Sequence, residues 1–461
     1  MTIKIDFKIL LIILLLTINS MFSQKSWTLD DCVAYALEHN LELNNLVYDM
    51  ESDRETYKQA VRNLLPKVGL FSDYSIRYGR SVDPNDNTIS DRDFFSNTYS
   101  LEASLDIFQG FQKINAIKAS KLIYKATEEE TLQQKYLLAF RVMQAFYDVQ
   151  FLEGSLEIAR EQEVISQSNY DLVTKQIELG LMAGADRFEA ESLLLSDQLG
   201  VSQAKNQLDA AKLTLMQEMN LKGNFNSSFE IKKINEITIS ESNAVISDSI
   251  YGKAENFIPI IKAGELRVEA AKKQLAVERG SLYPSLSLFG GYGTGYFETI
   301  MDDAGTTIPF RNQFEDNAFK FIGVSLTIPI TNGWATRSKM KQQKIIQLQA
   351  KNNLDIQKQE LFQTIQSLVQ EHNALQTEYE QTVKNARAQN QAFVIAQKRY
   401  EKGLISSIEL FTAKNLFATA QNLKLQVGLR VKINKSTLDF YRGLPVFNIQ
   451  NVHDINTPTG N

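Results

Sequence analysis

The stretch "SLYPSLSLFGGYGTGY", residues 281–296, combines a proline, apolar residues at every second position, and closely spaced glycines and tyrosines. A similar stretch, "NLLPKVGLFSDYSIRY", occupies residues 63–78. A shift of 218 positions (284 − 66) places Pro66 on Pro284 and superimposes the alternating apolar residues. Alternation with a period of two is typical of a β-strand that has one apolar side. The chain therefore contains the same strand-forming segment twice.

The repetition extends beyond the strands. After them the shift grows to 223, which places Gly110 on Gly333 and Gly180 on Gly403. A longer second loop and strand end account for the five additional residues (223 − 218). Self-similarity over so long a period indicates a duplicated architecture. We therefore expect both halves of the chain to share one plan.

Proline positions predict long helices. The eight prolines leave the stretches 85–258 and 330–444 free of proline, and both stretches are rich in Ala, Leu, Gln, Glu and Lys. These residues favour helices, whereas proline interrupts them. A helix over 111–178 has 68 residues (178 − 111 + 1) and measures about 100 Å at 1.5 Å per residue. Helices of this length suit a rod or a tube and not a compact globule.

These patterns give a predicted organisation for the whole chain. A half-length helix opens each repeat, at about 28–64 and 250–282, and Thr28 with Asp31 resembles an N-terminal cap. The predicted segments are a signal peptide at 1–23; a first structural repeat at 24–221, with strands at about 67–79 and 97–108, a long helix at 111–178, a tip, and a return helix at 186–221; an irregular segment at 222–249; a second structural repeat at 250–441, with strands at about 285–296 and 319–330, a long helix at 334–401, a tip, and a return helix at 409–441; and a C-terminal tail at 442–461.

The N-terminus predicts export. Lys4 and Lys8 precede a short apolar run at 9–16, and small or polar residues follow, with cleavage expected near Ser23. The alternative, a membrane anchor, needs about 20 apolar residues. Cys32 is the only cysteine, which excludes an internal disulfide and a thiolate metal cluster, so we expect it to pack as a small apolar residue. The formal net charge of −5 gives no reason to expect a nucleic-acid partner.

The four predicted strands are apolar on one side and polar or very small on the other, as with Leu101 and Leu105 against Glu102. Such strands, with tyrosines at their ends, match the signature of a transmembrane β-barrel. An ordinary soluble antiparallel sheet alternates in the same way and stays open as an alternative. The polar loops at 80–97 and 297–318 and the export signal favour the outer membrane. Four strands cannot enclose a lumen, and lipid tolerates no open sheet edge. Two copies give eight strands (2 × 4) and three give twelve (3 × 4), and geometry alone leaves this choice open.

Several motifs occur in a fixed order along the chain. They are "WTLDDCVAYALEHN" at the start, "LLPKVGLF" and "LYPSLSLF" at the hairpins, "SLTIPITNGW" before the second long helix, "KRYEKGLISSIELFTAKNLF" at a helix turn, and "LDFYRGLP" near the end. Over the whole mature chain this order resembles the TolC-like outer-membrane efflux family, the channel-tunnels. The resemblance implies a homotrimer with a shared 12-stranded outer-membrane barrel and a long α-helical periplasmic tunnel. It places 222–249 and 442–461 in an equatorial belt around that tunnel.

No catalytic or cofactor-binding motif is found. "GGYGTG" at 290–295 lacks the Gly-Lys-Ser/Thr of a phosphate-binding loop, so we interpret its glycines as small residues that face a crowded barrel interior. His39, His372 and His453 are isolated, and no Gly-x-Ser-x-Gly elbow occurs. We therefore expect neither catalytic nor metal-binding residues and no cofactor. The predicted function is a passive outer-membrane channel of a tripartite efflux or type I secretion system.

The helix-hairpin turns are the predicted functional sites. Gly180 and Gly403 permit a tight reversal, and Leu181 and Leu404 follow them. The resemblance makes these turns periplasmic tips that dock a membrane-fusion adaptor protein, which connects the channel indirectly to an inner-membrane pump. The alternative functions are a structural or adhesive stalk protein and a periplasmic adaptor-like protein without its own pore. Strict heptads would favour the stalk, and soluble barrel domains without membrane strands would favour the adaptor.

The resemblance also implies a periplasmic gate near the tips. It assigns an acidic ring to Glu409, while Thr412 stands where a second acidic ring is expected. It pairs Tyr400 with Asp186 in a hydrogen bond that latches neighbouring coils shut, and Ile405 stands where the latch has a basic residue. The alternative is that Asp186 and Glu409 are charges favoured by the N-terminal ends of helices.

Overall fold

The computed structural model describes residues 26–82, 87–91, 93–221, 229–233, 247–447 and 449. The predicted signal peptide at 1–23 lies outside the described residues, as do most of the segment 222–249 and the end of the tail at 442–461. The chain divides into two compact units. Unit 1 comprises Met1–Val47, Glu130–Ile261 and Lys358–Asn461, and unit 2 comprises Tyr48–Glu129 and Lys262–Gln357. Each unit therefore takes residues from both predicted repeats.

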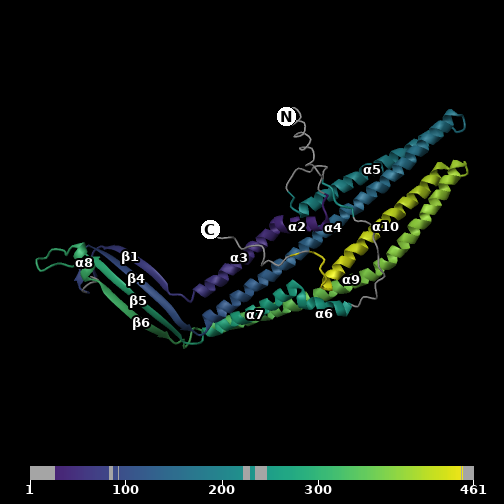
Figure 1. Ribbon diagram of the computed structural model, residues 1–461. Coiled ribbons are helices and arrows are strands. Elements are labelled where there is room, and N and C mark those ends of the chain that lie inside the picture. Colours follow the sequence, from purple (N-terminus) through teal and green to yellow (C-terminus); the bar gives the residue numbers. More distant parts are fainter. Residues whose placement is uncertain are drawn as a thin grey trace, which may run out of the picture. The chain divides into compact units, whose positions relative to one another are not determined.

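The described residues form long helices and one main sheet (Figure 1). The helices are α2 (Leu29–His39), α3 (Leu41–Arg62), α4 (Gln112–Glu178), α5 (Gly184–Glu218), α6 (Ser247–Phe257), α7 (Pro259–Gly280), α8 (Phe310–Asp316), α9 (Ala335–Glu401) and α10 (Ser407–Tyr441). The strands are β1 (Lys67–Arg77), β2 (Ser81–Val82), β3 (Ile89–Ser90), β4 (Phe94–Gln109), β5 (Ser285–Phe297) and β6 (Phe319–Thr327).

Corresponding helices of the two halves have equal lengths. α4 and α9 both have 67 residues, and α5 and α10 both have 35. The predicted internal duplication is therefore present in the fold. Within the described ranges, no helix combines the length and the hydrophobicity that a membrane span requires.

The half-length helix predicted at the start of each repeat is wrong as a single helix. Asn40 separates α2 from α3, and Pro259 opens α7 directly after α6. Asn40 has an extended backbone with ψ at 121°, and its Oδ1 accepts a hydrogen bond from the Leu43 N–H at 2.9 Å. Pro259 disfavours helical geometry at Ile258 and lacks its own N–H. Both breaks fall at equivalent positions, because the shift of 218 places residue 41 on residue 259 (259 − 41).

The turn from strand to long helix is also duplicated. Gly110 and Phe111 have φ of 55° and 63°, and Gly333 and Trp334 have φ of 61° and 65°. Two successive residues in the left-handed region reverse the chain sharply, and the aromatic residues adopt it only at a cost. A Cβ at Gly110 would lie 2.2 Å from the carbonyl oxygen of Gly280, so glycine is required there.

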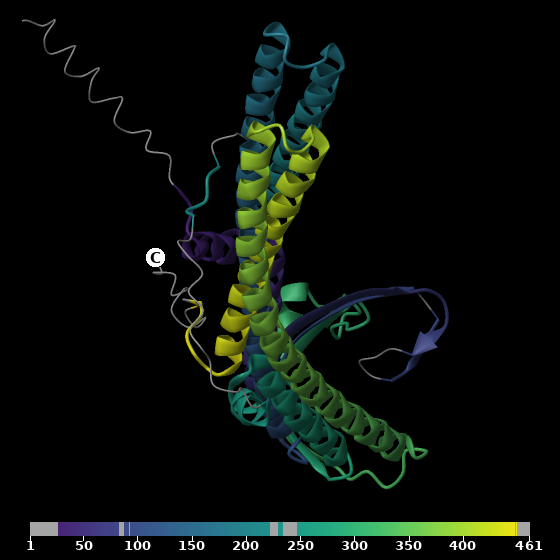
Figure 2. The ribbon, with the colours of Figure 1, turned by 90° about the vertical axis from the view of Figure 1, so that its right-hand side faces the viewer.

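Unit 1 has a hydrophobic core between α2, α4 and α5. Cys32, Met143, Phe146 and Leu215 are each 0 or 1% exposed. Burial raises the pKa of Cys32 to about 12, with Asp31 as a smaller cause. The prediction that Cys32 packs as a small apolar residue is therefore confirmed. Four long helical segments of this unit, from α4, α5, α9 and α10, run side by side (Figure 2).

The start of α2 has the predicted cap. The Thr28 Oγ1 accepts a hydrogen bond from the Asp31 N–H at 3.2 Å, and an Asp31 carboxylate oxygen accepts one from the Thr28 N–H at 3.1 Å. Each of these bonds satisfies a backbone donor that has no partner within the helix. The cap thus fixes where the chain enters the core of unit 1.

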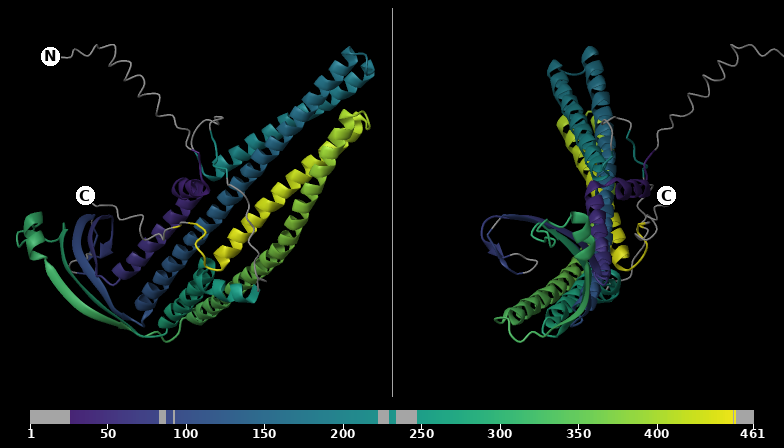
Figure 3. Two further views of the ribbon diagram at one scale, coloured as in Figure 1. Left: turned by 45° about the vertical axis from the view of Figure 1, so that its right-hand side comes forward. Right: turned by 90° about the vertical axis from the view of Figure 1, so that its left-hand side faces the viewer.

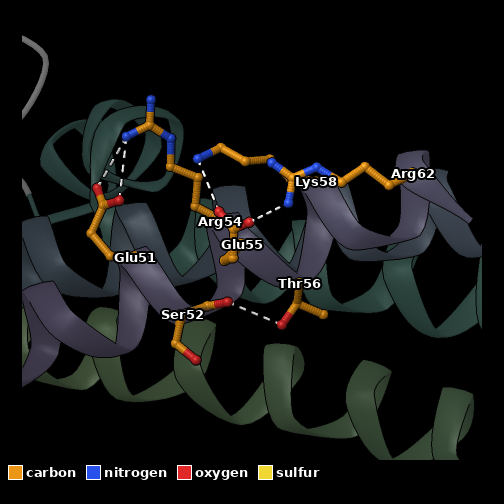
Figure 4. Close-up of polar contacts among 7 residues, drawn as sticks. All are labelled: Glu51, Ser52, Arg54, Glu55, Thr56, Lys58 and Arg62. Carbon is orange, nitrogen blue, oxygen red and sulfur yellow. Dashed lines mark hydrogen bonds and ion pairs between the residues drawn. The ribbon is translucent and has the colours of Figure 1, made fainter.

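The part of α3 that belongs to unit 2 carries a charged, solvent-facing side (Figure 4). Arg54 contacts Glu51 at 3.3 Å, and Glu55 contacts both Lys58 at 3.0 Å and Arg62 at 2.5 Å. These side chains are about half exposed, so each pair contributes little to stability. Their effect is to keep this side of the helix in water.

The sheet of unit 2 has the order β1-β4-β5-β6 and is antiparallel throughout (Figure 3). Its two edges, β1 and β6, come from different halves of the chain. β6 ends at Thr327, before Pro329 and short of the predicted residue 330, because proline cannot donate to a strand ladder. An irregularity between Asp106 and Phe108 leaves Ile107 unpaired, so the predicted alternation of β4 shifts by one residue there.

Candidate functional site

Residues that pair directly across the sheet share a side, so the register defines its two faces. One of them is called the apolar face below. It comprises Val68, Leu70, Ser72, Tyr74 and Ile76 of β1; Phe95, Asn97, Tyr99, Leu101, Ala103, Leu105 and Phe108 of β4; Leu286, Leu288, Gly290, Tyr292, Thr294 and Tyr296 of β5; and Lys320, Ile322, Val324 and Leu326 of β6.

The apolar face is largely uncovered in the single chain. Leu70 is 77% exposed and Ile322 is 81% exposed, although both are among the most hydrophobic residue types. Among the paired positions of this face, Lys320 is the only charged residue. A large, contiguous, exposed apolar surface marks an interaction with a membrane or with another chain.

The opposite face, called the polar face below, has five charged residues at its paired positions. It also carries six phenylalanines that the sequence analysis did not assign to it. The charged residues are Lys67, Asp73, Arg77, Glu102 and Asp106, and the phenylalanines are Phe71, Phe94, Phe289, Phe297, Phe319 and Phe321.

Five of these phenylalanines, all except Phe94, lie over a glycine of the same sheet. A Cβ at Gly323 would lie 2.5 Å from the Phe289 ring, and one at Gly293 would lie 2.5 Å from the Phe319 ring. The repeated glycines of β5 and β6 therefore accommodate rings that lie against the backbone. Gly290 differs, because it pairs with Ile322 and lies on the apolar face. Ring packing on the polar face thus accounts for the glycines of β5 other than Gly290, and their place in a barrel interior stays a prediction.

The first helix-hairpin tip joins α4 to α5. Gly180 has a φ of 75°, and its N–H donates to the Ile177 carbonyl at 2.9 Å. The Leu181 N–H donates to the Gln176 carbonyl at 2.8 Å, which completes a helix C-cap of the Schellman type. Leu181 itself is 72% exposed, so the tip presents an apolar side chain to solvent.

The second tip, between α9 and α10, has the same geometry. Gly403 has a φ of 70°, and its N–H donates to the Tyr400 carbonyl at 2.8 Å. The Leu404 N–H donates to the Arg399 carbonyl at 2.9 Å, and Leu404 is 63% exposed. Both predicted docking pairs therefore lie on equivalent, solvent-facing turns.

The predicted acidic gate residues occupy equivalent positions in their helices. An Asp186 carboxylate oxygen accepts a hydrogen bond from the Ala183 N–H at 3.0 Å, and a Glu409 oxygen accepts one from the Ser406 N–H at 3.1 Å. Within one chain, therefore, each carboxylate accepts a hydrogen bond from a backbone N–H at the start of its own helix, as the alternative interpretation expected. This contact leaves the second oxygen of each carboxylate available for a further partner.

Tyr400 and Thr412 also make contacts within their own hairpin. The Tyr400 hydroxyl lies 3.3 Å from the Ser407 Oγ, and the Thr412 hydroxyl donates to the Ile408 carbonyl at 2.8 Å. Within the described part of the chain, no hydrogen bond joins Tyr400 to Asp186. The predicted latch between neighbouring coils thus stays a prediction.

A buried ion pair that the sequence analysis missed connects the two hairpins of unit 1. Lys414 of α10 is 2% exposed and contacts Asp197 of α5. Its Nζ also donates to the Ser166 Oγ of α4 at 2.7 Å, and Ser166 donates to Asp197 as well. Burial is the largest influence on the pKa of Lys414 and lowers it, while Asp197 acts in the opposite direction. The signal was available, because Lys414 continues the buried stripe of Ser407 and Leu410 at helical spacing.

The comparison with protein families decides the identity of this fold. The model of the outer membrane efflux protein family matches residues 33–221 and 251–444, which cover both hairpins, both tips and the sheet. The chain belongs to this family. The match falls on the two halves separately, in agreement with the internal duplication.

Individual relatives of this family are similar along nearly their whole length. Outer membrane protein TolC of Vibrio cholerae is 22% identical over 429 residues, which cover 91% of each chain. The cation efflux system protein CusC of Escherichia coli is 22% identical over 417 residues, which cover 88% of this chain and 84% of CusC. The crystal structure of the outer membrane protein VceC from Vibrio cholerae superimposes with a TM-score of 0.76 at 18% identity, covering 90% of this chain and 96% of VceC.

The family confirms the main predictions from the sequence. The protein is an outer-membrane efflux channel of the TolC-like type, mostly helical, with four antiparallel strands in its sheet. Its relatives are channel proteins and not enzymes. The periplasmic adaptor and the adhesive stalk, which were the alternatives, are not supported by this match.

Proposed function

We propose that three copies of this chain form a passive conduit with a shared 12-stranded barrel (3 × 4) in the outer membrane and a helical tunnel in the periplasm. The observation that carries the proposal is the four-stranded sheet with two open edges and one uncovered apolar face. Lipid excludes unpaired strand edges, so β1 and β6 need partners.

Strand directions support closure by identical copies. Each of the four strands runs antiparallel to its neighbour, so β1 and β6 run in opposite directions. The β6 edge of one copy therefore meets the β1 edge of the next in the same antiparallel sense. A cyclic trimer repeats this contact three times and leaves no edge. The chain carries out no catalytic step in this proposal, and the energy for transport comes from an inner-membrane pump.

The tips are the proposed docking sites for a periplasmic adaptor. Gly180 with Leu181 and Gly403 with Leu404 give the same turn with the same exposed leucine. A trimer presents six such turns (3 × 2). An adaptor with helical hairpins of its own can contact all of them through one repeated interaction, in which the leucines insert between its helices.

The gate of the conduit is proposed to lie near the same end. Threefold symmetry repeats Glu409 around a narrow mouth, and the uncharged Thr412 leaves this as a single acidic ring. Clustered carboxylates concentrate cations and repel anions. Asp186 and Tyr400 of neighbouring coils form the latch. Asp186 uses its second carboxylate oxygen, and Tyr400 uses the hydroxyl that also contacts the Ser407 Oγ.

Planar-bilayer recordings of purified trimers test the gate. Glu409→Gln should reduce cation selectivity and block by divalent cations, because it removes three charges from the mouth. Glu380→Gln, on the exposed side of α9, is the matched control and should leave both unchanged. Unchanged selectivity in Glu409→Gln would remove this residue from the constriction.

The latch is tested by the combination of Tyr400→Phe with Asp186→Ala. A hydrogen bond to a charged group contributes about 1.5–3 kcal/mol. Loss of three such bonds should raise single-channel conductance and sensitise cells to large antibiotics while the trimer stays intact. Native mass spectrometry checks the oligomer. Equal conductance in variant and wild-type trimers would show that the two residues serve only their own helices.

A further inference from the structure

The loop between β5 and β6 contains a short helix, α8, that is fixed to the sheet. Gln313 of α8 is 2% exposed, and its Oε1 accepts a hydrogen bond from the Phe297 N–H at 2.9 Å. Its Nε2 donates to the Ile308 carbonyl at 2.7 Å and to the Phe297 carbonyl at 3.0 Å. The Asn317 Nδ2 donates to the Gly295 carbonyl at 2.8 Å. These hydrogen bonds fix α8 to the end of the sheet.

The helix packs on the apolar face. The Thr294 Oγ1, which belongs to that face, donates to the Phe314 carbonyl at 2.7 Å. Phe314 meets Tyr99 edge to face at 5.7 Å between ring centroids, and Phe310 lies 5.6 Å from Tyr296. Both tyrosines are also on the apolar face. α8 therefore projects on the outside of any barrel whose lumen is lined by the polar face.

The aromatic rings of α8 remain accessible in spite of this packing. Phe310 is 44% exposed and Phe314 is 37% exposed. The side chains of Arg311 and Glu315 are 90% and 70% exposed and lie 3.7 Å apart. The helix thus has an apolar side that continues the apolar face and a charged side directed away from it.

The position of α8 along the strands agrees with a membrane boundary. From Leu286 to Tyr296, β5 rises by about 33 Å, which spans about 25 Å of membrane at a strand tilt of about 40°. This is about the height of the apolar band of such barrels. At the other end of the sheet, Phe111 and Trp334 are 59% and 66% exposed. Exposed aromatic residues therefore lie at both ends of the sheet.

We propose that α8 is an interfacial foot that contacts the lipid of the outer leaflet. The inference rests on the proposed function, in which the apolar face of the sheet meets lipid. Phe310 and Phe314 extend the aromatic belt sideways at the headgroup level, where aromatic side chains partition well. The Arg311–Glu315 pair faces water and headgroups. Because α8 is held on the outside, its loop stays away from the mouth of the pore, and the barrel gains a fixed depth in the membrane.

Fluorescence quenching by lipids tests this foot. A single tryptophan is introduced in the full-length protein, in a background where Trp27 and Trp334 are phenylalanine. The reporter is Phe310→Trp, and Ile322→Trp serves as the reference on the apolar face. Asn312→Trp, on the opposite side of α8, is the matched control. The trimers are reconstituted in vesicles that contain lipids brominated at shallow or deep positions of the acyl chain.

The proposal expects Phe310→Trp to lose emission with the shallow quencher, Ile322→Trp to lose it with the deep one, and Asn312→Trp to keep it. If Ile322→Trp is quenched and Phe310→Trp is not, the foot is overturned while the proposed channel stands. If Ile322→Trp is not quenched by either lipid, the apolar face does not meet lipid, and both the orientation of the barrel and the foot are overturned.

Discussion

The two helix-hairpin tips have the same backbone and different side-chain chemistry. Gly180 and Gly403 have φ within a few degrees of each other, and a leucine with more than half of its surface exposed follows each of them. Three residues after the glycine, the first tip has Ala183 and the second has Ser406. Eleven residues after it, the first hairpin has Glu191 and the second has the buried Lys414. Duplication has thus kept what the reversal requires and has let the two hairpins diverge elsewhere.

The largest expected effect comes from the buried ion pair between the hairpins, to which only the second hairpin contributes a lysine, Lys414. Lys414→Met should lower the free energy of unfolding by about 3 kcal/mol, because Asp197 then stays largely buried without its partner. Guanidinium unfolding followed by circular dichroism measures the loss. The combination of Lys414→Met with Asp197→Leu should recover most of it, since two apolar side chains replace the pair. An unchanged free energy of unfolding in Lys414→Met would mean that water can replace Lys414 as the hydrogen-bond partner of Asp197.

The next effect tests what the two tips share. Gly180→Ala and Gly403→Ala should each cost about 1–2 kcal/mol, because a Cβ is disfavoured at their positive φ. Gly184, which lacks a positive φ, is the matched control, and Gly184→Ala should be neutral or stabilising. Hydrogen exchange at the tips reports the change. Unequal costs at the two glycines would show that the two reversals are not equivalent.

Substitutions at the N-cap positions should change stability by a smaller amount, and in opposite directions at the two tips. Ser406→Ala removes the Oγ that accepts the Glu409 N–H at 3.3 Å and should cost about 1 kcal/mol. Ala183→Ser should gain a similar amount, because Asp186 already forms the other half of a capping box. In Ala183→Ser, the backbone amides of the first turn of α5 should exchange more slowly. In Ser406→Ala, those of the first turn of α10 should exchange faster. If Ala183→Ser destabilises the protein, the N-caps of α5 and α10 are not equivalent.

The smallest effect concerns Tyr400, whose counterpart in the first hairpin is Ile177. Tyr400→Phe removes the contact with the Ser407 Oγ and should cost about 0.5–1 kcal/mol of local stability. The measurement is hydrogen exchange at the second tip, with the first tip as the internal reference. A loss well above this range would indicate a further partner for the hydroxyl, as the proposed latch between neighbouring coils requires.

The sequence predicted best those helices and strands that depend on residues close together in the chain. The absence of proline predicted α4 and α9, and the apolar alternation predicted the strands. Both signals depend on the spacing of residues that are close together in the sequence. The break between α2 and α3 was missed, since a single Asn40 acts there through its side chain. The phenylalanines of the polar face were missed for a different reason. For three of them the partner is a glycine on the neighbouring strand, such as Gly323 or Gly291, and only the register brings ring and glycine together.

The sequence by itself thus determined the duplicated plan, the lengths of the two long helices, the alternation along most of each strand and the family resemblance, because all of these depend on local period and composition. Only the tertiary structure decided the sheet order β1-β4-β5-β6, the Lys414–Asp197 pair and the position of α8. Each of these joins residues far apart in the chain, and their contacts depend on how elements pack. A lysine on an apolar stripe or a phenylalanine in a loop acquires its role only when the fold supplies the partner.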